Sequence, residues 1–331
     1  MVKGMKVLMT LGMATFLSAS LISCQGSMNT KAANALPDSA LVEGWEDGLK
    51  KEEAIGHKDT VGRGMLAKRL KEPIYIPVDT LSPLRKDSLE IWIKNEKRRI
   101  RDSVRLALDK FPKHIYFTFD DGPLLGSAAI DSISRAKNVK INVFLVGKHA
   151  YMSKALKRDF ELYYNNPLVE CYNHSYTHAN NRFTTFYSNP ISAYDDFEKN
   201  EVELKLKHKI IRLPGRNIWI YDDVRRVDLQ SGASTADMLY TNGYRIFGWD
   251  VEWKIHGLTG KPIQSVDEIY TRIRNYMDNK SSMEPNNVVL LMHDDMFRNK
   301  KGQQLLSTLI DTIQRNTNYT FEFMRNYPFR Y

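Results

Sequence analysis

Thr118-Phe119-Asp120-Asp121-Gly122-Pro123 ends an apolar run that begins at His114, and this stretch predicts a β-strand that terminates in two adjacent carboxylates. Ligands of open α/β sheets and barrels usually bind at the carboxyl ends of the strands. Because successive strand residues point to opposite sides, one carboxylate can hold a metal ion while the other handles a proton. The simpler interpretation is an acidic turn that caps the next helix.

Two histidines four residues apart, His174 and His178, follow a second apolar run over 168–172. This spacing predicts both imidazoles on one face of a helical turn, and imidazole nitrogens are good ligands for zinc and similar ions. With Asp121 they make a three-ligand site, which leaves positions open for water and a substrate carbonyl. A structural zinc site closes all four positions, and the chain lacks the cysteines for that. The chemistry indicated is therefore catalytic.

Together with later motifs in matching order, these segments resemble the polysaccharide deacetylases of the NodB-homology class, carbohydrate esterase family 4, over residues 114–325. The resemblance implies that Asp120 is the catalytic base. It also implies that Asp121, His174 and His178 hold the metal. The family's distorted seven-stranded (β/α) barrel is the fold it implies.

Two later motifs extend the resemblance. Arg212-Leu213-Pro214 matches the motif whose Arg pairs with the catalytic Asp and holds it ionised. The stretch from Leu290 to Asp294 matches the motif whose His, here His293, protonates the leaving amine, and Leu291 would line the acetyl pocket.

Two departures from the family pattern concern the substrate pocket. After Pro214 the family often has an aromatic residue whose backbone N–H contributes to the oxyanion hole, and this chain has Gly215, which implies a more open pocket wall. The fourth motif is represented by Trp249-Asp250-Val251-Glu252-Trp253. Either Asp250 or Glu252 is expected to tune His293. Trp249 and Trp253 are expected at the pocket, with core filling as the alternative.

The chemistry can be stated from the residues alone. Hydrolysis of an acetyl amide or ester needs a nucleophilic water, a stabilised oxyanion and a proton for the leaving group. A divalent metal, for which we expect zinc with cobalt or nickel as alternatives, supplies the first two. Asp120 takes the proton from water, an adjacent Arg212 keeps its pKa low, and His293 protonates an amine near neutral pH.

Residues 1–23 combine Lys3 and Lys6 with an apolar stretch too short for a confident membrane span. The ending Leu21-Ile22-Ser23-Cys24 resembles a bacterial lipobox, which predicts cleavage before Cys24 and lipidation of its thiol. An ordinary secretory signal is the alternative. Lipidation would leave Cys171 without an intramolecular partner. Gln25 favours the outer membrane of a bacterial envelope under familiar sorting rules.

Residues 24–81 are polar and mixed and are predicted to be a tether. Residues 82–113 are predicted to form an amphipathic helix that packs one apolar stripe on the catalytic domain. Its other faces are very basic and account for much of the formal net charge of +9. Solvation is the simple explanation, and anionic lipid headgroups or an acidic polymer are alternative partners. Nucleic acid is not an expected partner, because no recognition motif is present.

Residues 114–331 are predicted to form the catalytic domain. We expect the protein to be a monomer. Apolar strand-like runs alternate with amphipathic segments, which predicts an α/β barrel of about seven parallel strands, with a flat doubly wound sheet as the alternative. The expected strands are 114–119, 141–146, 168–172, 210–213, 244–249, 287–292 and 319–324. The expected helices are 127–137, 150–164, 191–207, 221–241, 265–278 and 301–315.

Three functions fit this sequence. The first is a metal-dependent deacetylase of N-acetylglucosamine-containing glycans such as peptidoglycan or chitin-like oligomers. The second is an O-acetyl esterase on polysaccharides such as xylan. The third is a glycan-binding lipoprotein with little turnover. Retention of both an acid and a base argues against the third, because binding alone needs neither.

Overall fold

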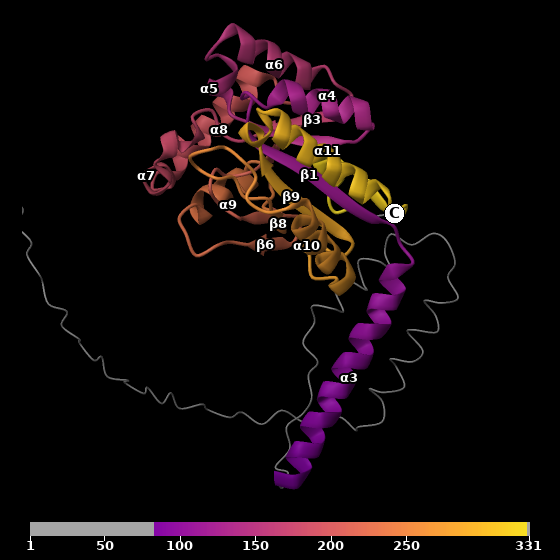
Figure 1. Ribbon diagram of the computed structural model, residues 1–331. Coiled ribbons are helices and arrows are strands. Elements are labelled where there is room, and N and C mark those ends of the chain that lie inside the picture. Colours follow the sequence, from indigo (N-terminus) through magenta and orange to yellow (C-terminus); the bar gives the residue numbers. More distant parts are fainter. Residues whose placement is uncertain (1–82, 330–331) are drawn as a thin grey trace, which may run out of the picture. The chain divides into compact units, whose positions relative to one another are not determined.

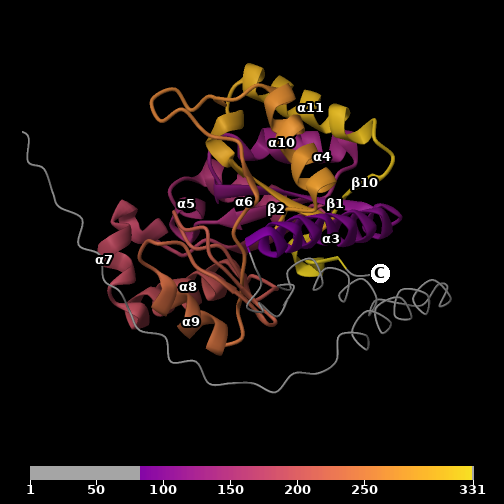
Figure 2. The ribbon, with the colours of Figure 1, turned by 90° about the horizontal axis from the view of Figure 1, so that it is seen from below.

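The structure, a computed structural model, describes residues 83–329 and contains one mostly parallel sheet flanked by helices (Figures 1 and 2). The predicted signal peptide, Cys24 and the predicted tether lie outside these residues. Among the described residues, no helix combines the length and the apolar character that a bilayer span requires.

The sheet has ten strands, in the order β6-β5-β7-β4-β3-β2-β1-β9-β8, and β10 pairs with the beginning of β1. All pairings are parallel except those of β5 with β6 and β7. The strands are β1 (Lys113–Gly122), β2 (Ile141–Leu145), β3 (Val169–Asn173), β4 (Ile210–Ile211), β5 (Trp219–Tyr221), β6 (Val224–Arg226), β7 (Arg245–Ile246), β8 (Val251–Glu252), β9 (Asn287–His293) and β10 (Tyr319–Phe321).

Two separate hydrophobic clusters show that the sheet encloses an interior. The inner cluster, which includes Tyr116, Phe144, Tyr172 and Phe247, contains no residue of an α-helix. The outer cluster joins the opposite faces of the same strands to residues of the helices. A doubly wound sheet would carry helices on both faces. The predicted distorted barrel is therefore confirmed, as a curled sheet whose end strands β6 and β8 do not pair with each other in the described part of the chain.

Alternation along β1 decides which side chains enter the barrel. Phe117 and Phe119 belong to the outer cluster, whereas Tyr116 belongs to the inner one. Residues two apart in a strand share a face, so Thr118 and Asp120 also point inward. The sequence of the strand therefore delivers a carboxylate to the interior at its carboxyl end.

Most helices agree with the predicted ranges to within a few residues. The exceptions are the predicted helix 150–164, which is divided into two helices, a helix over Phe183–Tyr187 that was not predicted, and the chain between β4 and β7. There the predicted helix 221–241 is replaced by the β5–β6 hairpin and a shorter helix, α9. Asp222 turns the hairpin with a left-handed φ of 48°, a conformation that Asp tolerates better than most residues. The helices of the domain are α4 (Ser127–Lys137), α5 (Gly147–Ala150), α6 (Lys154–Tyr164), α7 (Phe183–Tyr187), α8 (Pro190–Leu204), α9 (Ala233–Thr241), α10 (Val266–Asn279) and α11 (Lys300–Gln314).

The basic helix predicted over 82–113 is present as α3 (Pro83–Asp109). Among the residues of this helix from 87 onward, whose side chains the structure describes, Val104 and Leu108 are the buried apolar ones. The last turn is tied to the domain by two hydrogen bonds, from Lys280 Nζ to Asp109 at 2.6 Å and from Asn286 Nδ2 to the Leu108 carbonyl at 2.7 Å. The contact that the helix makes with the domain is thus concentrated at its carboxyl end.

Candidate metal and catalytic site

The two carboxylates at the end of β1 diverge because the backbone changes between them. Asp120 continues the strand and its side chain is almost fully buried inside the barrel. Asp121 has a left-handed φ of 70°, which a residue with a Cβ adopts only at a cost of about 1–2 kcal/mol. Such strain is characteristic of functional sites. The change from extended to left-handed backbone places the two neighbouring carboxylates at different positions in the same site.

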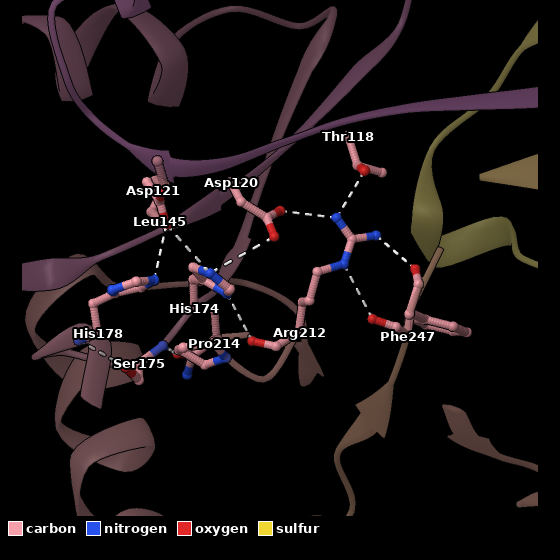
Figure 3. A network of polar contacts seen from close by, with 12 residues as sticks. Thr118, Asp120, Asp121, Leu145, His174, Ser175, His178, Arg212, Pro214 and Phe247 are labelled. Carbon is pink, nitrogen blue, oxygen red and sulfur yellow. Dashed lines mark hydrogen bonds and ion pairs between the residues drawn. The ribbon is translucent and has the colours of Figure 1, made fainter. Parts of the chain in front are cut away.

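Arg212 is completely buried and binds Asp120 directly (Figure 3). Its Nη1 donates to Asp120 Oδ1 at 2.8 Å and to Thr118 Oγ1 at 2.7 Å. Its other nitrogens donate to the carbonyls of Phe247, at 3.2 Å, and Gly248, at 2.8 Å. A buried charge is tolerated only when it is paired and hydrogen-bonded. The predicted pairing of Arg212 with Asp120 is therefore present, and it fixes the orientation of the carboxylate.

His174 and His178 both turn their Nε2 atoms toward Asp121 (Figure 3). His174 Nδ1 lies 2.8 Å from the Arg212 carbonyl, and His178 Nδ1 lies 3.1 Å from Asn181 Oδ1. An oxygen acceptor requires each Nδ1 to carry the proton, so both Nε2 atoms present a lone pair. Protein partners that fix the tautomer in this way are typical of metal-binding histidines.

The histidines do not lie on a helical turn as predicted. His174 follows directly after β3, and residues His178–Asn181 form a short 3-10 element in which all four φ values are positive. The two rings nevertheless approach to 5.3 Å between centroids. The left-handed turn, rather than the four-residue helical spacing, brings His178 back toward Asp121.

The donor set fits a divalent metal ion. One ligand atom each from Asp121, His174 and His178 lies within 4.8 Å of the others. Asp121 Oδ1 is 3.0 Å from His178 Nε2 and 3.5 Å from His174 Nε2, yet it is buried without a properly oriented hydrogen bond. An ionised oxygen without a hydrogen-bond donor is suited to a cation.

His293 ends β9 and is the direct neighbour of Asp120 in the sheet. Leu291, two residues earlier, is paired with Thr118 and is almost completely buried. His293 Nδ1 is buried and has no hydrogen-bond partner among the described residues. The strand thus brings His293 and Leu291 to the site, as the sequence predicts, but leaves one ring nitrogen uncommitted.

Neither predicted carboxylate hydrogen-bonds to His293 in the described part of the chain. Asp250 is partly buried, and its two oxygens accept hydrogen bonds from the backbone N–H groups of Met283, at 2.6 Å, and Val289, at 2.9 Å. Burial raises its pKa to about 7. Glu252 lies on the short strand β8, half-exposed, and makes no hydrogen bond or ion pair with His293 in the described chain. Asp250 instead connects the residue before β8 to β9 and to the loop that precedes β9.

Besides Leu291, four residues were predicted for the substrate pocket, and they divide into two groups. Trp253 is completely buried and donates its indole N–H to the Gln264 carbonyl at 2.9 Å, so it fills the core. Trp249 is only partly buried and lies 5.9 Å from the Arg212 guanidinium. Pro214 and Gly215 follow Arg212, and the Gly215 backbone has a left-handed φ of 65°. An added Cβ at Gly215 would lie 3.3 Å from the Phe183 ring.

Three site residues were not predicted. His149 on α5 hydrogen-bonds to the Asp121 carbonyl at 2.7 Å, Asn181 holds His178, and the Phe183 ring packs against His178 with 5.8 Å between centroids. A polar residue soon after an apolar strand was the only sequence signal for His149. Asn181 and Phe183 gave no signal, because their roles depend on the left-handed turn.

Several solved structures are similar to this chain. Among solved structures the chain is similar to a CE4 esterase from Streptococcus mutans, with 18% identity over 66% of this chain and 89% of that chain and a TM-score of 0.48. It is also similar to the catalytic domain of a peptidoglycan N-acetylglucosamine deacetylase from Eubacterium rectale, with 20% identity over 63% and 87% and a TM-score of 0.45. A third similar structure is a CE4 family pseudoenzyme from Bacillus anthracis, with 16% identity over 65% of each chain and a TM-score of 0.46.

No curated protein matches the chain. A family model does: residues 108–229 match the model described as polysaccharide deacetylase. The matched range contains β1, β3 and β4 and therefore both carboxylates, both histidines and Arg212. The part of the chain that builds the metal and catalytic site is thus similar to the polysaccharide deacetylases.

Proposed function

We propose that this chain is a metal-dependent hydrolase that removes acetyl groups from a polysaccharide, and in particular N-acetyl groups from N-acetylglucosamine-type residues of a peptidoglycan or chitin-like glycan. The observation that carries the proposal is one juxtaposition. An Arg-bound buried carboxylate, Asp120, lies next to a cluster of ligand atoms from Asp121, His174 and His178. The family match over 108–229 supports the polysaccharide substrate.

Asp121, His174 and His178 would hold one divalent ion, and we propose zinc, with cobalt or nickel as substitutes. When bound, the ion supplies Lewis-acid polarisation of the acetyl carbonyl and makes water a better nucleophile. The three protein ligands leave coordination positions for other groups, as in catalytic zinc sites.

Asp120 is assigned as the general base. Its Oδ1 is occupied by Arg212, whereas its Oδ2 faces His174 Nε2 across 3.6 Å without a hydrogen bond. Oδ2 is therefore the oxygen available to accept a proton from the attacking water. Arg212 orients the carboxylate from within the protein, so its orientation does not depend on substrate binding.

His293 is assigned as the general acid. It lies opposite Asp120 across the β1–β9 pair, and both residues belong to the inner face of the sheet. An amine leaves an amide only after protonation, so an imidazole at this position completes the hydrolysis. Leu291 and Trp249 provide apolar surface near the acetyl group, in keeping with their burial.

Acetate release tests the proposal. The full-length protein is incubated with N-acetylated chitooligosaccharides, peptidoglycan fragments and O-acetylated xylooligosaccharides, with added zinc or cobalt and in a parallel reaction with chelator. We expect metal-dependent acetate release from the N-acetylated glycans. Release from xylan oligomers alone would replace the proposal with an O-acetyl esterase, and binding without release would replace it with a glycan-binding protein.

The acid assignment has its own test in His293→Ala. An activated aryl acetate releases a phenolate that needs no proton, whereas an amide releases an amine that does. His293→Ala should therefore reduce N-deacetylation more than aryl acetate hydrolysis. Equal losses on the two substrates would show that His293 supports the metal or the fold, and the assignment would be withdrawn.

We also propose that the chain is a lipoprotein of a bacterial cell envelope, anchored through Cys24 and facing away from the cytoplasm, most simply on the outer membrane. The lipobox-like Leu21-Ile22-Ser23-Cys24 supports this location, which suits an envelope glycan as substrate. Cys24→Ser should release the protein from the membrane fraction. Unchanged membrane association would point instead to the basic helix or an uncleaved signal.

A further inference from the structure

The short helix α5 lies between the two loops that carry the ligands. Its first residue, Gly147, follows β2, and a Cβ there would lie 2.3 Å from Asn200 Oδ1 and 2.5 Å from the Tyr176 ring. Only glycine allows the helix to come this close. On this side the Lys148 N–H donates to the Tyr176 carbonyl at 2.9 Å. The helix is thus fastened to the loop that contains His174 and His178.

On its other side α5 is fastened to Asp121 through a side chain. His149 Nδ1 lies 2.7 Å from the Asp121 carbonyl. A carbonyl oxygen only accepts, so Nδ1 is the protonated nitrogen and donates. The end of β2 reinforces the contact, because the Val146 N–H donates to the Gly122 carbonyl at 2.8 Å. The peptide groups on both sides of Gly122 are therefore held from the same segment.

The contact acts on a strained residue. Asp121 has its φ at 70°, and a left-handed aspartate persists only where the surroundings enforce it. Its carbonyl direction and its carboxylate direction are linked through the same Cα. A donor that fixes the carbonyl therefore also limits where Oδ1 can point.

From this geometry we infer that His149 is a positioning residue for the metal ligand Asp121. Its Nδ1–H holds the left-handed Asp121 peptide so that Oδ1 faces the Nε2 atoms of His174 and His178. The inference rests on the proposed function, because it requires that these three residues bind an ion. Residues that orient a ligand in this way typically contribute about 10–100-fold to metal affinity.

Two substitutions separate the donor from the shape of the side chain. Asparagine places Nδ2 the same number of bonds from Cα as histidine Nδ1, so His149→Asn keeps a donor for the Asp121 carbonyl. Leucine has the same branching at Cγ and no donor. His256→Leu is the matched control, because it removes an exposed histidine whose ring accepts a local hydrogen bond from the Thr259 N–H.

Cobalt(II) binding to the full-length apoprotein is measured by calorimetric titration and by the visible absorption of the bound ion, and urea unfolding confirms that each variant is folded. We expect His149→Leu to weaken cobalt binding by roughly 10–100-fold, His149→Asn to recover much of that loss, and His256→Leu to match the wild type.

Each other outcome has a definite meaning. Wild-type affinity in His149→Leu would overturn the inference and leave the proposed function standing. Equal weakening in the Leu and Asn variants would also overturn it, because the donor would then be irrelevant. No cobalt binding by the wild type would overturn the proposed metal site and this inference together.

Discussion

The site has two sides that are built from different kinds of backbone. The base side, made of Thr118, Asp120 and Arg212, stands on β1 and on the residue directly after β4, and its polar atoms bind one another and the carbonyls that follow β7. The ligand side, made of Asp121, His174 and His178, lies at the end of β1 and in the loop after β3, and Asp121 and His178 have left-handed φ values of 70° and 53°.

The two sides differ in whether their charged atoms have partners within the protein. On the base side Arg212 neutralises Asp120, so the pair is complete within the protein. On the ligand side Asp121 Oδ1 remains buried without a hydrogen bond, although two imidazole nitrogens face it. The protein therefore completes the base by itself, whereas the ligand side is completed only by a cation. Substitutions on the two sides should fail in different ways.

The largest effect is expected on the base side, from Asp120→Asn. The variant keeps the size of the side chain but loses the proton acceptor, so kcat for deacetylation should fall by roughly two to four orders of magnitude. Cobalt affinity should stay near the wild-type value, because Asp120 is not among the three ligands. Steady-state acetate release and metal titration are the measurements.

His178→Ala is the matching change on the ligand side and should lose metal and activity together. If Asp120→Asn deacetylated at the wild-type rate, the base assignment would be wrong. If His178→Ala kept its metal stoichiometry, the ligand assignment would be wrong. The proposed difference between the two sides requires that Asp120→Asn keeps its metal and loses activity, and that His178→Ala loses both.

The second effect concerns stability. Arg212→Met leaves the buried carboxylate of Asp120 without its partner, and breaking a buried pair in this way costs about 3–5 kcal/mol of unfolding free energy. Adding Asp120→Asn removes the stranded charge and should restore part of that loss. Urea unfolding of the single and double variants gives both values. A fully stable Arg212→Met protein would show that the pair does not hold the base side together.

The base side was predictable because a strand has a fixed period. Once 114–119 was identified as a strand, the inward direction of Asp120 followed from alternation, and Arg212 follows another apolar strand run in the same way. The alternation of apolar runs with amphipathic segments also indicated the barrel. The short strands β5, β6 and β8 were missed because two or three residues carry no period.

For the ligand side, the sequence predicts which residues come together but not the backbone conformation that brings them together. His174 and His178 were correctly brought to Asp121, but the helical turn assumed for them is wrong, because a run of left-handed residues has no clear sequence pattern. Asp250 and Trp253 make contacts other than the predicted ones, for a related reason. A carboxylate that binds backbone N–H groups and a tryptophan that fills the core look the same in sequence as functional residues.

The third prediction concerns Asp294, which connects β9 to the loop that follows Asp121. It is fully buried and accepts hydrogen bonds from Gly126 N at 3.0 Å, Ser127 Oγ at 2.6 Å and Tyr163 OH at 2.9 Å. Burial raises its pKa from 3.8 to about 7. A raised pKa means that its protonated form is favoured in the folded state. Its contribution to stability is complete below its ordinary pKa and is lost as the pH rises toward 7.

Asp294→Asn removes this loss, because an amide stays neutral, accepts from Gly126 N and donates to a hydroxyl. The unfolding free energy of the variant relative to the wild type should therefore increase between pH 4 and 7, by at most about 1.4 kcal/mol per pH unit. Urea unfolding in the presence of chelator measures it without a contribution from bound metal. A difference that does not change with pH would show that Asp294 titrates at its ordinary pKa in the folded protein.

The smallest effect is expected at Gly215, a residue with left-handed backbone that follows Arg212 and Pro214 in the chain. Its φ of 65° costs a residue with a Cβ about 1–2 kcal/mol, and an added Cβ would lie 3.3 Å from the Phe183 ring. Gly215→Ala should therefore lower the unfolding free energy by about 1 kcal/mol. Gly257→Ala is the matched control, since its Cβ meets nothing within 4 Å and its φ is not left-handed. Phe183→Leu in the Gly215→Ala background separates the two causes, because it shortens the crowding ring but leaves φ unchanged. Continued destabilisation in the double variant would assign the cost to the backbone, as the comparison of the two sides requires, whereas full recovery would assign it to contact with Phe183.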